Sequence, residues 1–157
     1  SLINAVSKLK NVHLIIRYRT IDGLDHNKLK EILPKSDSYS IATDGIFSDY
    51  LLISDLLVSF SSTTMEEALQ NNIPVLLFNK YNRYQHIRGT ELSLRGKGFT
   101  PSALYNVNYE DDLLFAIKWI ISNHLSKKID LGKLFSKYKY TDSEIINLPK
   151  FVKGVLE

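Results

Sequence analysis

The chain contains no cysteine, so no disulfide framework exists, and this absence suits a reducing cytoplasm. No apolar run approaches the length of a membrane span. The opening segment SLINAVSKLK lacks the apolar core and the cleavage site of a secretory signal. No metal-ligand spacing, Walker loop or G-x-G-x-x-G pattern occurs. We therefore expect a cytoplasmic protein with no bound metal.

What is present is an ordinary globular composition: 157 residues, 44% hydrophobic and 24% charged. The net charge of +3 is concentrated in residues 80–97 and 127–139. Such segments usually form solvated surface; otherwise they attract anions such as nucleotide phosphates, an acidic membrane face or nucleic acid. No RNA-binding signature supports nucleic acid. We predict one domain over residues 1–125 and a basic helical tail over residues 126–157 that packs on it.

Strand and helix signals alternate along the chain. Continuous apolar runs predict strands at residues 12–16, 39–42, 56–60, 75–78 and 101–105. Helical spacing predicts helices at residues 2–9, 25–33, 47–53, 65–71, 87–94 and 109–124. This pattern is typical of a parallel sheet covered on both faces. The predicted fold class is α/β, a Rossmann-like three-layer αβα sandwich.

In such sheets the ligand binds beyond the carboxyl ends of the strands. Those ends carry Arg17 and Arg19, and residues 43–47, 61–64 and 79–85. We therefore expect the chemical candidates to lie along one edge of the sheet.

The strongest candidates are the four hydroxyl residues Ser61, Ser62, Thr63 and Thr64, which stand between a strand and a helix. Their side-chain and backbone donors, together with the positive end of the helix dipole, favour a phosphate group. The alternative is helix capping, because Thr63-x-x-Glu66 and Thr64-x-x-Glu67 both fit a capping box. Capping needs one such residue and not four, and both interpretations can hold together.

Other candidates surround this turn. Glu67 shares a helix face with Thr63 and can accept hydrogen bonds from a ribose diol, or it is a surface residue. Arg17 and Arg19 suit phosphate, or they are solvated strand ends. Phe47 meets a base or covers the sheet edge.

Several other residues are predicted to have structural or peripheral roles. His13 lies inside an apolar strand and is predicted to be a core residue. In the helix at residues 25–33, Leu29, Ile32 and Leu33 are predicted to face inward. In the loop at residues 81–88, Asn82, Arg83 and Gln85 could contact a sugar or an acceptor, whereas His86 is predicted to be a surface residue.

Residues 55–78, DLLVSFSSTTMEEALQNNIPVLLF, resemble the donor-binding half of glycosyltransferases of the two-Rossmann B-type (GT-B) fold. The surface-polysaccharide and teichoic-acid polymerase branches are most similar, together with UDP-N-acetylglucosamine 2-epimerase. Those proteins share an apolar strand, a small or hydroxyl turn, a helix with Glu-Ala or Glu-Glu-Ala, and Gly-Lys-Pro-Val or similar before the next strand. Ile73-Pro74-Val75 fills the last position here. The resemblance covers residues 12–121.

The resemblance implies roles for particular residues. Ser61, Ser62 and Thr63 bind the diphosphate of a nucleotide-sugar donor, Glu67 holds the ribose, and the Phe47 region meets the base. Gln85 faces the donor sugar, although the Asp that precedes this Gln in the family is missing. The basic residue and His-Pro that often follow the second strand are replaced here by Arg17-Tyr18-Arg19-Thr20.

The resemblance also implies that this chain is a carboxyl-terminal half, truncated before its first strand and glycine-rich turn. The acceptor domain, which supplies the catalytic base, lies outside it, so we expect no catalytic residue here and no turnover in isolation. Its partners would be the nucleotide-sugar donor as substrate, the acceptor domain and the inner face of the membrane, with no separate cofactor. Alternatives are half of an epimerase-like enzyme, a non-catalytic Rossmann-like binding module and, last, RNA binding.

Overall fold

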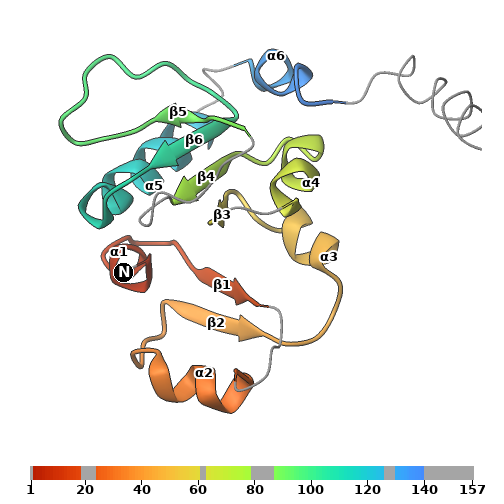
Figure 1. Ribbon diagram of the computed structural model, residues 1–157, viewed down its shortest axis with the longest axis vertical. Helices are drawn as coiled ribbons and strands as arrows, with labels where there is room; N and C mark the ends of the chain where they lie inside the picture. Colours follow the sequence, from red (N-terminus) through yellow and green to blue (C-terminus); the bar gives the residue numbers. More distant parts are fainter. Residues whose placement is uncertain (1, 19–23, 61–62, 79–86, 126–129, 140–157) are drawn as a thin grey trace, which may run out of the picture.

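The computed structural model describes residues 2–18, 24–60, 63–78, 87–125 and 130–139 (Figure 1). The helices are α1 (Leu2–Val6), α2 (His26–Ile32), α3 (Phe47–Leu52), α4 (Thr64–Gln70), α5 (Glu110–Leu125) and α6 (Leu131–Ser136). The strands are β1 (Leu14–Arg17), β2 (Tyr39–Ala42), β3 (Leu57–Ser59), β4 (Val75–Phe78), β5 (Thr90–Glu91) and β6 (Leu104–Val107).

These strands form two sheets in which every pairing is parallel. One sheet is β1–β2, and the other has the order β3-β4-β6-β5. Helix α2 joins β1 to β2 and α4 joins β3 to β4, in the alternating order that the sequence predicted. The chain is therefore α/β with a Rossmann-like arrangement.

The larger sheet is covered on both faces. Side chains alternate along β4, so that Leu76 and Phe78 belong to one core cluster while Val75 and Leu77 belong to another. The first core cluster also contains buried residues of α1 and α5, and the second contains those of α3, α4 and α6. The result is a three-layer αβα sandwich around β3, β4 and β6.

The long helix α5 has the apolar stripe expected of a covering helix. Leu113, Ala116, Ile117 and Ile120 are buried at the spacing of one helical face. The buried carboxylate of Asp112, in the first turn, accepts a hydrogen bond of 2.8 Å from the backbone N–H of Leu94. Helix α5 thus covers one face of the sheet and also fixes the loop after β5.

The smaller sheet is much less covered. No residue of β1 or β2 is fully buried, and neither is any residue of α2. The inward orientation predicted for Ile32 is wrong, because this side chain is 61% exposed. The core position predicted for His13 is also wrong: its ring is exposed and hydrogen-bonds to Ser40 Oγ at 3.0 Å. With so few neighbours over this sheet, apolar residues remain in contact with water.

The helix predicted at residues 87–94 is wrong. This segment contains the short edge strand β5, which pairs with β6. Gly89 makes the pairing sterically feasible, because a Cβ there would lie 2.6 Å from the backbone carbonyl carbon of Tyr105. The strand predicted at residues 101–105 begins three residues later and ends two residues later, as β6.

Helix α6 lies in the predicted basic tail and packs against the second core cluster. Its Phe135 ring is fully buried there. The side-chain amide of Gln70, at the end of α4, donates to the backbone carbonyl of Tyr138. Residues 140–157 lie outside the described part of the chain. In the part that is described, no helix is both long and apolar enough to cross a bilayer.

Candidate functional site

The predicted phosphate turn is described only in its second half, because Ser61 and Ser62 lie outside the described residues. Thr63 is the N-cap residue of α4, and its exposed side chain makes no capping hydrogen bond. Instead, its backbone carbonyl accepts a bond of 3.0 Å from Glu66 N. The capping-box interpretation is therefore wrong for the Thr63 side chain, which is exposed.

Glu67 lies one helical turn after Thr63. The two side chains are four residues apart on α4, and both are exposed. Thr64 is the first residue of the helix and is half-buried. A hydroxyl and a carboxylate thus face solvent on the same side of α4, as a diphosphate and its ribose would require.

Arg17, at the end of β1, reaches the turn that follows β2. Its guanidinium donates to the backbone carbonyls of Asp44 at 2.8 Å and of Gly45 at 3.0 Å. The guanidinium also lies 4.9 Å from the centre of the Tyr50 ring, and the Tyr50 hydroxyl donates to Asp44 O at 3.0 Å. We call these four residues the Arg17 clamp. Sequence reasoning missed it, because backbone carbonyls leave no signal in a sequence.

Gly45 is required by the Arg17 clamp for a backbone reason. Its φ of 72° lies in the left-handed region, and a Cβ would lie only 3.2 Å from Cε2 of Tyr50. The turn at residues 43–45 is therefore held from two directions, by Arg17 and by Tyr50. Two of the donors of Arg17 are already engaged with protein carbonyls.

Phe47 is the first residue of α3, and its half-buried ring packs against the second core cluster. This contact matches the interpretation that the ring covers the sheet edge, and contact with a base stays a prediction. Arg19, Gln85 and His86 lie outside the described residues. The described candidates form two groups: the Arg17 clamp with Phe47 after β1 and β2, and Thr63, Thr64 and Glu67 after β3.

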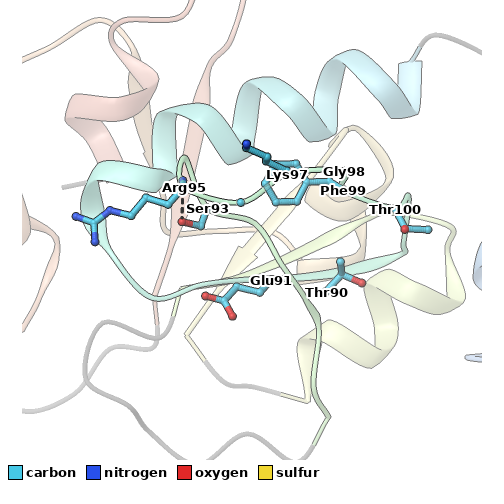
Figure 2. Close-up of a pocket in the computed structure, with 9 residues that line it drawn as sticks. Thr90, Glu91, Ser93, Arg95, Lys97, Gly98, Phe99 and Thr100 are labelled. Atoms are coloured by element: carbon cyan, nitrogen blue, oxygen red, sulfur yellow. Dashed lines mark hydrogen bonds between the residues drawn. The ribbon is translucent and has the colours of Figure 1, made fainter.

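A concavity of about 520 Å³ lies elsewhere, at β5 and the following loop (Figure 2). Its lining residues are Thr90, Glu91, Ser93, Arg95, Gly96, Lys97, Gly98, Phe99 and Thr100. None of the predicted site residues is among them. Its one carboxylate, Glu91, accepts a hydrogen bond from Asn108 at 3.3 Å. Since the hollow is broad and open and its cationic side chains are exposed, we assign it no chemistry.

A buried polar pair lies between the sheet and α5. The Tyr105 hydroxyl accepts from Ser102 N at 2.8 Å and lies 2.9 Å from Nε2 of His124. The other ring nitrogen of His124, Nδ1, is a buried atom that has no hydrogen-bond partner among the described residues.

Burial governs the titration of this pair. It raises the pKa of Tyr105 to about 12, with a smaller opposing effect from the Ser102 hydrogen bond. Burial also lowers the pKa of His124 below its usual value, against a smaller opposing effect of the Ser102 backbone. With Tyr105 at 0% and His124 at 7% exposure, no substrate reaches either group, so the pair is structural.

In the described segments, no group of three or more His, Cys, Asp or Glu residues is arranged to hold a metal ion. No protein-family model, no curated protein and no solved structure matches the chain. A functional interpretation therefore depends on the sequence motif and on the geometry of the two candidate groups.

Proposed function

We propose that the chain is the nucleotide-sugar-binding domain of a glycosyltransferase of bacterial surface-polysaccharide synthesis, and that it is inactive without its acceptor domain. The observation that carries the proposal is a change of face by the crossover helices. Helix α1, before β1, contributes Ala5 and Val6 to the first core cluster. Helices α3 and α4, which precede and follow β3 in the sequence, contribute Leu51 and Met65 to the second core cluster.

Such a change of face, between β1 of the smaller sheet and β3 of the larger one, is typical of a switch point. In open α/β sheets, ligands bind at a switch point, outside the carboxyl ends of the strands beside it. Here the strands beside it are β1 and β3. The Arg17 clamp follows β1 and β2, and the hydroxyl turn follows β3. Both candidate groups therefore follow strands whose carboxyl ends favour ligand binding.

Each group has a role that fits its chemistry. The hydroxyl turn, residues 61–64, would hydrogen-bond the diphosphate and stabilise its charge as it departs from the sugar. Glu67, exposed on the same side of α4, would accept hydrogen bonds from the ribose hydroxyls. The turn at residues 43–47 would lie against the base, with its backbone held by Arg17.

Nucleotide titration tests the proposal. UDP, CDP and CMP are added separately to the chain, and amide NMR shifts are recorded. We expect shifts at Thr63, Thr64 and Glu67 with at least one nucleoside diphosphate. Removing one phosphate hydrogen bond through Thr63→Ala should weaken its affinity by roughly tenfold, about 1.4 kcal/mol. Thr100→Ala, which alters an exposed threonine of the other concavity, should leave the affinity unchanged.

The same experiment separates the non-catalytic alternative. If residues 61–64 bind no ligand, Ser62→Ala and Thr63→Ala leave nucleotide affinity unchanged. Thr63→Ala then also leaves the free energy of unfolding nearly unchanged, because this side chain makes no capping hydrogen bond. The absence of shifts at residues 63–67 with all three nucleotides would contradict donor binding. Sugar transfer by this chain alone would contradict its dependence on an acceptor domain.

A further inference from the structure

In each sheet, an outer strand has a strand partner on one side and, among the described residues, none on the other. Strand β1 pairs only with β2, and β3 pairs only with β4. Leu14 of β1 and Val58 of β3 nevertheless pack against the same first core cluster. In Figure 1, β1 is the strand of its sheet that lies nearer to β3. The sheet is therefore interrupted between β1 and β3.

The backbone groups at this interruption can be assigned. Leu14 N donates to Ser38 O at 2.9 Å, next to β2, and Leu57 N donates to Pro74 O at 3.0 Å, next to β4. Because N–H directions alternate along a strand, the N–H groups of Ile15 and Val58 point the other way, toward the interruption. Unpaired edges of this kind recruit another strand.

The position of α1 indicates what belongs there. A strand–helix–strand crossover between parallel strands is right-handed. Helix α4 joins β3 to β4 and lies on the face of the second core cluster. Helix α1 lies on the opposite face, so a crossover through α1 runs across the sheet in the opposite direction. A strand leading into α1 then lies on the side of β1 that faces β3.

We propose that β1 and β3 together accept one further parallel β-strand, which belongs to polypeptide leading directly into α1. With it the order becomes β2-β1-strand-β3-β4-β6-β5, a continuous doubly wound sheet. The strand is apolar on both faces, because Leu14 and Val58 border the interruption on one face and Leu57 on the other. This inference rests on topology and is independent of nucleotide binding.

Hydrogen exchange tests the proposal. In residues 1–157, the amides of Ile15 and Val58 should exchange roughly 100-fold faster than the paired amides of Leu14 and Leu57. In the polypeptide extended upstream of α1 by its natural sequence, both should slow by a similar factor. Unchanged exchange in the extended chain would overturn the proposal. Protection that rises with the concentration of residues 1–157 alone would also overturn it, and would assign the edges to a second copy.

A cysteine pair tests the same point in the 157-residue chain, which has no cysteine of its own. A gap of one strand width separates two Cα atoms by about 10 Å, which is too far for a disulfide. Leu14→Cys/Val58→Cys, two positions that face the first core cluster, should therefore stay reduced under mild oxidation. The control, Leu14→Cys/Tyr39→Cys, joins register partners on neighbouring strands and should oxidise. Oxidation of the first pair as fast as the control would show direct pairing of β1 with β3 and refute the proposal.

Discussion

Strands β1 and β4 have the same length and similar local sequences, yet their surroundings differ. The segment LIIR of β1 has no fully buried residue, whereas all four residues of VLLF in β4 are buried. Strand β4 has a strand on each side and a core cluster on each face. Strand β1 has one neighbouring strand among the described residues. Burial in this molecule therefore follows from the number of neighbours and not from local apolarity.

The largest expected difference comes from deleting buried methyl groups in each strand. Leu76→Ala in β4 should lower the free energy of unfolding by about 3 kcal/mol, because its side chain is fully buried and the cavity cannot collapse. Ile16→Ala in β1 should cost about 1 kcal/mol, because that side chain already contacts water. Urea unfolding followed by circular dichroism measures both values. Equal costs would mean that β1 is as well covered as β4.

The Tyr105–His124 pair should show the next largest effect. Tyr105→Phe removes the oxygen that accepts from Ser102 N–H and that hydrogen-bonds to His124 Nε2, so the free energy of unfolding should fall by about 2 kcal/mol. Tyr109→Phe is the matched control, since its side chain is 68% exposed and its change should stay within about 0.5 kcal/mol. Thermal unfolding of both variants compares them directly. A loss for Tyr109→Phe as large as that for Tyr105→Phe would contradict the buried-pair argument.

Acidification should weaken the same region. The pKa of His124 is lower in the folded chain than its usual 6.5, so the unfolded chain binds more protons as the pH falls through 6.5. The stability that neutral His124 contributes is fully present above pH 6.5. It is lost progressively as the pH falls from 6.5 to the pKa of His124 in the folded chain. His124→Gln should flatten this part of a urea-midpoint profile against pH. An unchanged slope in that variant would assign the decline to other groups.

The smallest effect is expected at the Arg17 clamp. Arg17→Ala removes two hydrogen bonds to exposed carbonyls and should cost about 1 kcal/mol, confined to the smaller sheet. Hydrogen exchange at β2 should accelerate, while the amides of β4 stay unchanged. Arg17→Lys keeps the charge but loses the planar fork, so it should resemble the alanine variant. Full rescue by lysine would indicate that charge alone matters.

The sequence predicted the larger elements well because their signals are local. Apolar runs bounded by turn residues marked β2 and β4 at their observed limits, and helical spacing marked α5 to within one residue. Prediction from the sequence failed where tertiary neighbours determine the secondary structure or the burial of a residue. The helix expected at residues 87–94 is the edge strand β5, whose pairing depends on the close approach of Gly89 to Tyr105. Ile32 and His13 are exposed because little packs over the smaller sheet.

The candidate site was predictable in outline only. The carboxyl ends of parallel strands were expected to meet at one edge, and Arg17 at the end of β1 does lie near the turn that follows β2. The receiving atoms, however, are backbone carbonyls, which every residue has. Tyr105 and His124 are 19 residues apart and meet only because α5 lies on β6. Contacts of this kind depend on tertiary packing, which local patterns do not encode.

If a ligand binds at the Gly45 turn, the Arg17 clamp would link ligand binding to the stability of the smaller sheet. Because the guanidinium ties the Gly45 turn to the end of β1, a ligand resting on that turn would hold the least protected sheet together. Any molecule that binds only the folded form adds its binding free energy to the folding equilibrium. The empty domain would then open first along β1 and β2, and a saturating ligand would slow its proteolysis there.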